Sequence, residues 1–157
     1  MTPVLSYDVF LSFRGEDTRK GFVDHLSTTL HEKGIHTFKD DTELKRGSSI
    51  SPILEKAIES SEVALVVFSK NYADSSWCLD EIVKIVECNK KFGQKIYPVF
   101  YNVDPSDVRK QKGSYKIAFD KYENDPNVEK EKIKSWRNAL KEAASVSGWD
   151  TNHTADG

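Results

Sequence analysis

The chain has 157 residues, of which 31% are charged, and its formal net charge is -2 at pH 7. Because Lys, Arg, Asp and Glu alternate along the sequence, we expect no basic face for nucleic acid and no charged tail. The longest apolar runs, VALVVF and IYPVFY among them, are far shorter than a membrane span, so we expect one soluble, intracellular domain with no membrane contact.

Apolar runs rich in β-forming residues alternate with helical patterns, which indicates βαβ units. We expect strands YDVFLSF, IHTFK, EVALVVFS and KIYPVFYNV at 7–13, 35–39, 62–69 and 95–103. The helical patterns cover 18–34, 49–61, 75–93, 113–122 and 128–148. EVALVVFS is apolar at almost every position, as expected for a central strand. The sequence predicts an α/β, doubly wound parallel sheet with helices on both faces. It has four to five strands, the fifth being a short one, without a visible pattern, between DPSDVRKQKG and the last helix.

Residues typical of helix ends agree with this pattern. Asp17 or Thr18 is expected to cap the first helix, and Gly34 is expected to end it in a left-handed turn. Pro52 is expected in the first turn of the second helix. After the last helix the sequence DTNHTADG is polar and small. The expected boundaries are an N-terminal extension at 1–5, one domain at 6–149 and a polar tail at 150–157.

The segments that follow the expected strands are polar and long. They read FRGEDTR, DDTELKRGSS, SKNYADSSWCLDE and NVDPSDVRKQKG, whereas returns from helix to strand, such as EKGIH, are short. In an open, doubly wound sheet, ligands bind beyond the carboxyl ends of the strands. We therefore expect the functional site at that edge.

Several familiar sites are excluded by their key residues. FRGEDTRKGF opens a helix after a strand, but Phe22 stands where a phosphate-binding loop requires Lys. A phosphorelay receiver needs an aspartate at the end of its third strand, where this chain has Phe68–Lys70. Cys78 and Cys88 lie too far apart on one helix for a disulfide and lack the partners of a zinc site. With no nucleophile elbow or Ser-His-Asp set, we expect neither a metal site nor an activated serine.

Glu81 has an unexpected place in the helix that we expect from about Ser76 onward. The apolar stripe expected to face the core excludes Glu81, since it consists of Leu79, Ile82, Val83 and Val86 at i, i+3, i+4 and i+7. The side of the helix that carries Glu81 nevertheless also carries Trp77, Ile85 and Cys88. One interpretation is a surface carboxylate that meets the helix dipole. The other is a functional carboxylate, with the Trp77 ring one turn earlier available to stack on a base. Because the stripe excludes Glu81, truncation to Ala is expected to leave the fold intact.

Five segments, taken in order, carry a resemblance: YDVFLSFRGEDTR, GIHTFKDDTELKRG, VVFSKNYADSSWCLDEIVKI, PVFYNVDPSDVRKQKGSY and WRNALKEAA. Over about 6–149 they resemble the Toll/interleukin receptor homology (TIR) domain in its plant form. The resemblance implies a flavodoxin-like fold, cleavage of NAD+ at its nicotinamide bond and nucleotide products that start a cell-death defence response. We expect an excised domain of a plant immune receptor or a TIR-only protein.

The resemblance also implies roles for individual residues. Glu81 falls on the glutamate of the S-x-W-C-L-x-E motif, to which the family assigns catalysis, and its carboxylate is expected to stabilise positive charge on the ribose. NAD+ is then a substrate, and no cofactor is expected. Lys45 and Arg46 are alternatively contacts to the next protomer or solvated loop charges, and Trp77 alternatively packs the loop. The expected contacts with NAD+ are Phe13, Arg14 and Gly15 after the first strand, Lys45 and Arg46 in the DDTELKRG loop, and Ser75 and Trp77 beside Glu81.

The first helix carries Asp24 and His25 where many plant relatives have Ser-His as a self-association patch. His25 is expected at the contact, with the last helix from Trp136 to Lys141 as its counterpart. Asp24 would meet its own copy in a symmetric pair, which is expected to weaken the contact.

We therefore expect an NAD+ hydrolase of plant innate immunity that gives ADP-ribose or cyclic and variant nucleotides. It is expected to act as a homotypic tetramer, weak in isolation, with other TIR-type receptors as further partners. The expected location is the cytoplasm, with the nucleus as a second compartment. The alternative is a non-catalytic adaptor that signals by docking other TIR domains.

Overall fold

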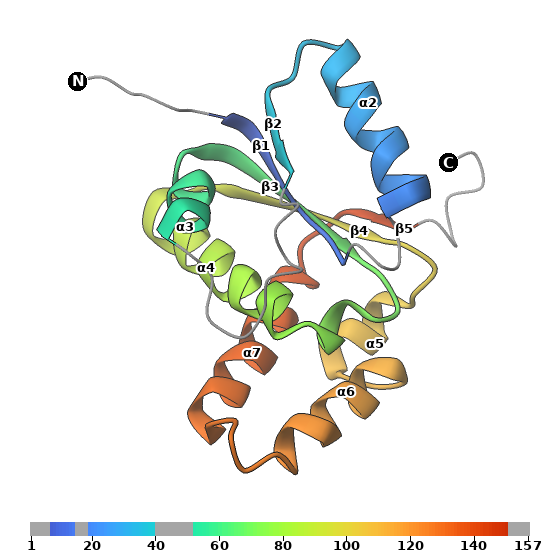
Figure 1. Ribbon diagram of the computed structural model, residues 1–157, viewed down its shortest axis with the longest axis vertical. Coiled ribbons are helices and arrows are strands. Elements are labelled where there is room, and N and C mark those ends of the chain that lie inside the picture. Colours follow the sequence, from blue (N-terminus) through green and yellow to red (C-terminus); the bar gives the residue numbers. More distant parts are fainter. Residues whose placement is uncertain (1–6, 15–18, 40–51, 151–157) are drawn as a thin grey trace.

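The computed structural model describes residues 7–14, 19–39 and 52–150. Strands and helices alternate along the chain, as Figure 1 shows. The elements are β1 (Tyr7–Ser12), the π-helical turn η1 (Arg19–Val23), α2 (Asp24–Glu32), β2 (Thr37–Lys39), α3 (Pro52–Glu59), β3 (Ser61–Phe68), the 3-10 turn η2 (Tyr72–Asp74), α4 (Ser76–Phe92), β4 (Lys95–Phe100), α5 (Pro105–Lys110), α6 (Ser114–Glu123), α7 (Lys130–Ala143) and β5 (Trp149–Asp150).

The strands form one sheet in the order β2-β1-β3-β4-β5, and every pairing between them is parallel. β3 lies at the centre, as its continuous apolar run predicts. From β1 the chain moves outward to β2, and from β3 it moves the other way to β4, so the direction of winding reverses between β1 and β3. The predicted flavodoxin-like, doubly wound sheet is confirmed.

Two apolar clusters cover the two faces of the sheet. The larger cluster packs α3, α4, α6 and α7 against strand residues that include Phe10 and Val66. The smaller cluster packs η1 and α2 against Leu11 and Val67. Successive side chains of a strand point to opposite faces, which is why neighbouring residues divide between the two clusters. α2 and α7 therefore lie on opposite sides of the sheet (Figure 1).

The predicted helix ends agree with the structure wherever it describes them. α2 is followed by Gly34 with a φ of +78°, the left-handed turn expected there. α3 begins at Pro52, and α4 begins at Ser76. Asp17 and Thr18, the expected caps of the first helix, lie outside the described residues.

The fifth strand does not lie between DPSDVRKQKG and the last helix, where the sequence analysis expected it. It follows α7 instead of preceding it, and Trp149 pairs with Val99 of β4. Gly148 permits this approach, because a Cβ at that position would collide with the carbonyl oxygen of Pro98. The sheet thus extends to Asp150, one residue past the expected end of the domain.

A short helix, α5, occupies the segment between β4 and α6. Asp104 caps it, with its Oδ1 accepting a hydrogen bond from the Ser106 backbone N–H at 2.8 Å. Pro105 stands in the first turn. An Asp followed by Pro is a helix-start signal, so the DPSD sequence contained the information needed to predict this helix.

Both cysteines lie on α4, and both are free and buried. Their Sγ atoms therefore form no disulfide, as expected. α4 has 17 residues, the longest helix among those described. Across the described part of the chain, no helix has both the length and the apolar character that crossing a membrane requires.

Candidate active site at the carboxyl edge of the sheet

Glu81 lies inside the protein at the carboxyl edge of the sheet, with 1% of its surface exposed. The Ser12 hydroxyl, on the last residue of β1, donates a hydrogen bond to Glu81 Oε1 at 2.8 Å. The Tyr72 hydroxyl, on η2, lies 2.8 Å from Ser12 Oγ. Three elements that are distant in the sequence thus bring their polar groups together around one carboxylate.

The direction of these hydrogen bonds follows from the number of available protons. A serine hydroxyl has one proton, so while Ser12 donates to Glu81 it can only accept from Tyr72. The Tyr72 hydroxyl has a second, longer acceptor in the Cys78 carbonyl oxygen at 3.2 Å. The Ser12 proton therefore points to the carboxylate, and the single Tyr72 proton lies between Ser12 Oγ and the Cys78 carbonyl oxygen.

The environment of Tyr72 keeps its hydroxyl protonated. Burial raises the pKa of Tyr72 well above its ordinary value, and the nearby Cys78 and Glu81 raise it further. The hydrogen bond with Ser12 acts in the opposite direction but does not outweigh burial. Because ionised tyrosine is disfavoured in this position, Tyr72 remains a hydrogen-bond donor at neutral pH.

The start of α4 sets the position of Glu81. Ser75 caps the helix, and its Oγ accepts a hydrogen bond from the Cys78 backbone N–H at 3.1 Å. The Cys78 thiol lies 3.5 Å from the carbonyl oxygen of Phe13, which follows β1. These contacts hold the first turn of α4 against the end of β1, where Ser12 stands.

The prediction that Glu81 lies outside the core is wrong. α4 is buried on both of its sides, so Trp77, Ile85 and Cys88 are buried as well as most of the expected stripe, whose member Val83 is half-buried. The amphipathic pattern failed here because α4 packs against the sheet on one side and against α3 and α7 on others. Truncation of Glu81 to Ala would remove a buried, hydrogen-bonded group, so it is not expected to be harmless to the fold.

The expected NAD+ contacts divide into two groups. Phe13 and Arg14 follow β1, and Ser75 and Trp77 begin α4, so the structure places all four at the same edge as Glu81. Gly15, Lys45 and Arg46 lie outside the described residues.

All four described contact residues are buried or half-buried, Ser75 being the half-buried cap of α4. Phe13 and Trp77 are buried, and Trp77, with 9% of its surface exposed, belongs to the larger apolar cluster. Arg14 is half-buried, and its guanidinium interacts electrostatically with Tyr122. Burial raises the pKa of Tyr122, and the hydroxyl donates to the Ala73 carbonyl oxygen at 2.7 Å. The burial of Trp77 argues against stacking on a base in this arrangement.

The residues expected to mediate self-association do not share one surface. Asp24 and His25 are exposed on α2, and Asp24 forms an ion pair with Lys39 at 3.6 Å. Lys141 is exposed on α7, but Trp136 is 2% exposed and packs in the core. Since α2 and α7 lie on opposite sides of the sheet, the two helices cannot form one continuous patch in a symmetric pair (Figure 1).

Ser12 and Tyr72 are site residues that the sequence motifs do not predict. Ser12 carried a weak signal, because it is a polar residue at the end of an otherwise apolar strand that leads to the functional edge. Tyr72 carried none, since a tyrosine in a polar loop has many structural roles. Their proximity to Glu81 depends on contacts between residues 60 and 69 positions apart.

Comparison with known proteins gives consistent results. A family model for the TIR domain matches residues 6–156. The disease resistance protein RPV1 of Vitis rotundifolia is 58% identical over 144 residues, which cover 92% of this chain and 10% of that protein. The TMV resistance protein N of Nicotiana glutinosa is 56% identical over 143 residues, or 91% of this chain and 12% of that protein. The chain thus spans about a tenth of the length of these relatives.

A solved structure shares both the sequence and the fold. The TIR domains in the structure of the activated Roq1 resistosome, which directly recognises the pathogen effector XopQ, are 59% identical in sequence. Their match has a TM-score of 0.89 and covers 97% of this chain and 92% of that one. The family model, the relatives and the sheet order agree, and this chain belongs to the TIR domain family.

Proposed function

We propose that this chain is an NAD+-cleaving TIR domain of plant innate immunity, with Glu81 as its catalytic carboxylate. The observation that carries the proposal is the placement of Glu81. It lies where the winding of the sheet reverses, beyond β1, and a chain of hydroxyl groups holds it. Ligand sites of doubly wound sheets lie at such switch points.

The proposed reaction breaks the bond between nicotinamide and C1' of the ribose. Nicotinamide leaves as a neutral molecule, so the reaction requires no general acid. The ribosyl centre gains positive charge, which the Glu81 carboxylate stabilises while it binds ribose hydroxyls. Attack by water then gives ADP-ribose, and attack by a nucleotide atom gives cyclic or transferred products.

The burial of Glu81 bears on how such activity is controlled. A carboxylate with 1% of its surface exposed cannot touch a substrate unless its surroundings rearrange. We propose that self-association, as a tetramer, favours the open arrangement, since a contact made only in that arrangement shifts the equilibrium towards it. The similarity to TIR domains of an activated resistosome supports an assembled active state.

The cellular role rests on the relatives. Those reported above are named as resistance proteins, and this chain matches about a tenth of their length. We propose that it serves in the cytoplasm, and in the nucleus as a second compartment, as the signalling domain of a receptor of that kind, with other TIR-type receptors as further partners.

One observation favours a second candidate, a non-catalytic adaptor that docks other TIR domains. In this arrangement Glu81 and Trp77 are both buried, as residues with a purely structural role would be. An adaptor would assemble with other TIR domains but leave NAD+ unchanged.

A direct experiment separates the two candidates. The protein is incubated with NAD+ at high concentration, and the products are identified by chromatography and mass spectrometry. The proposed function predicts free nicotinamide together with ADP-ribose or a cyclic or variant nucleotide. Intact NAD+ in the presence of protein that sedimentation shows to be assembled would instead establish the adaptor.

A further inference from the structure

We propose that Ser12 and Tyr72 are positioning residues for the Glu81 carboxylate, acting in series from Tyr72 through Ser12. The inference deepens the proposed function and rests on it. Neither residue is assigned a contact with NAD+, because the Ser12 hydroxyl is directed at Glu81 and the Tyr72 hydroxyl at Ser12 and the Cys78 carbonyl oxygen. Their effect on the reaction would be exerted through the orientation of Glu81.

The donor to the carboxylate is rigidly held. Ser12 pairs with Val66 of the central strand β3, so its backbone is fixed by the sheet. Its hydroxyl lies 2.8 Å from Glu81 Oε1, a length typical of an O–H···O hydrogen bond. A glutamate side chain has three rotatable bonds, and a fixed donor at its tip selects one of their combinations.

Tyr72 is held as firmly as Ser12. Its ring packs edge-on against Phe68 with centroids 5.2 Å apart, and its backbone N–H donates to the Ser69 carbonyl oxygen at 3.2 Å. Its hydroxyl at 2.8 Å from Ser12 Oγ favours the rotamer of the serine proton that points to Glu81. Tyr72 thus acts on the carboxylate only by way of Ser12.

A purely structural role is the competing explanation. Buried polar groups need hydrogen-bond partners whether or not they take part in a reaction. In that case removal of a hydroxyl would lower stability, but the remaining folded protein would turn over NAD+ at the normal rate. Positioning predicts a lower kcat in protein that is fully folded, with KM almost unchanged.

The test uses Ser12→Ala, Tyr72→Phe and the double variant, in the assembled protein under conditions where each is folded. Tyr72→Phe keeps the ring against Phe68, so it remains informative if Ser12→Ala folds poorly. The matched control is Ser61→Ala. Ser61 is also a buried serine in a strand, and its hydroxyl donates a hydrogen bond to the Ala57 carbonyl oxygen at 2.7 Å. It pairs with Tyr7 at the amino ends of β1 and β3, away from the carboxyl ends where Glu81 lies.

We expect Ser12→Ala to lower kcat about tenfold and to leave KM within about twofold, since a misplacement of about 1 Å costs about a hundredfold and loss of one hydrogen bond should displace the carboxylate by less. Tyr72→Phe should lower kcat by a smaller factor. The double variant should be no slower than Ser12→Ala alone, because Tyr72 has no effect once Ser12 Oγ is absent. Ser61→Ala should lose stability and keep its kcat.

Each contrary outcome has a separate meaning. A folded Ser12→Ala variant with normal kcat, in a protein whose wild type cleaves NAD+, overturns the positioning role alone. Losses that multiply in the double variant overturn the serial order and leave two independent residues. A folded, assembled wild type that does not cleave NAD+ overturns the proposed function, and the positioning role with it.

Discussion

Trp136 of α7 donates a hydrogen bond from its indole Nε1 to Asp80 Oδ1 of α4 at 3.0 Å. Asp80 immediately precedes Glu81, so this contact ties the last described helix to the turn that carries the candidate catalytic residue. Lys132 of α7 adds an ion pair with the same Asp80 oxygen at 3.7 Å. Trp136 is thus a residue of the core and of the site's support, and not of a self-association surface.

Trp136→Phe is expected to lower the free energy of unfolding by about 0.5–1.5 kcal/mol, because the half-buried Asp80 carboxylate loses one hydrogen-bond donor and keeps its ion pair with Lys132. Urea denaturation measures this loss, and Lys141→Ala, an exposed change on the same helix, is the control. A variant of normal stability with weakened self-association in sedimentation would return Trp136 to an interface.

Trp77→Ala is expected to lower the free energy of unfolding by about 3–5 kcal/mol, as for other large buried aromatic residues. The ring belongs to the larger apolar cluster, so its removal leaves a cavity. Denaturation and NAD+ turnover should be measured on the same sample. If stability is normal and only KM rises, the ring contacts the nucleotide, as the sequence first suggested.

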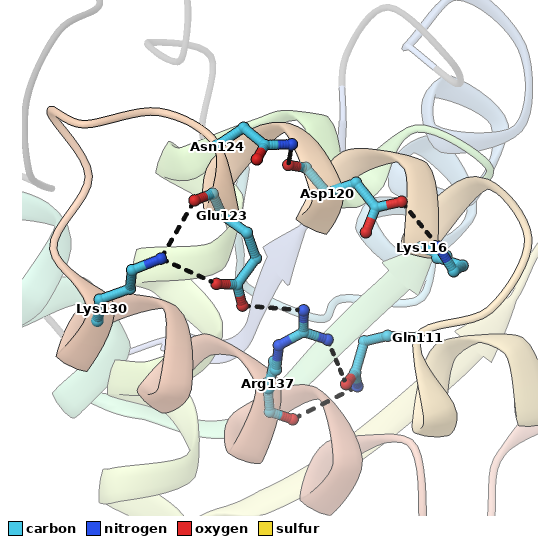
Figure 2. Close-up of polar contacts among 7 residues, drawn as sticks. All are labelled: Gln111, Lys116, Asp120, Glu123, Asn124, Lys130 and Arg137. Atoms are coloured by element: carbon cyan, nitrogen blue, oxygen red, sulfur yellow. Dashed lines mark hydrogen bonds and ion pairs between the residues drawn. The ribbon is translucent and has the colours of Figure 1, made fainter.

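A network of polar side chains joins α5, α6 and α7, as Figure 2 shows. Arg137 donates from its guanidinium to Glu123 at 3.2 Å and to Gln111 Oε1 at 3.4 Å. The Arg137 hydrogen bond, with a contribution from Lys130, lowers the pKa of Glu123 from its ordinary value of 4.5. Because the folded state lowers this pKa, the stabilising contribution is present above pH 4.5 and is lost as the pH falls through the folded-state pKa.

The Glu123→Gln variant should therefore lose slightly less stability than the wild type when the pH is lowered. Melting temperatures of wild type and variant, measured from neutral pH down to below pH 4.5, should converge at the acid end, where Glu123 is protonated in both states. The carboxylate is exposed, so the difference at neutral pH is expected to be small and to shrink in salt. A constant difference at every pH would contradict the assignment.

Activity is expected to rise faster than linearly with protein concentration if assembly opens the site. His25→Ala should depress specific activity at low concentration, and fusion to an oligomer should rescue it. Asp24→Ser should strengthen association by less than about 1 kcal/mol, since exposed charges contribute little and Lys39 already pairs with Asp24. Specific activity that stays constant on dilution, with sedimentation showing monomer throughout, would contradict the dependence on assembly.

The sequence was most informative where a local pattern has one structural solution. The run EVALVVFS, apolar at almost every position, became the central strand, and the helix expected from about Ser76 begins at that residue. β5 was misplaced, because two residues have no periodicity and pair only through contact with β4. The burial of α4 on both sides was also unpredictable locally, since it depends on which elements pack around the helix.

In the candidate site too, local sequence predicts some features, whereas others depend on contacts between distant elements. Motif resemblance indicated Glu81, but the groups that hold it come from elements distant in the sequence, and only the folded chain brings Ser12 and Tyr72 to the carboxylate. The separation of α2 from α7 likewise depends on which face of the sheet each helix covers, and helical periodicity does not encode that choice.

The most direct test of the account compares nicotinamide release by Glu81→Gln and Glu87→Gln, two isosteric changes on the same helix. Glu81 is buried and hydrogen-bonded to Ser12, whereas Glu87 is exposed. In assembled protein, with melting curves that show both variants folded, Glu81→Gln is expected to lower release about a hundredfold or more, as for loss of a charge that stabilises a transition state. Glu87→Gln is expected to match the wild type. Folded Glu81→Gln that releases nicotinamide at the wild-type rate would contradict the catalytic role of Glu81.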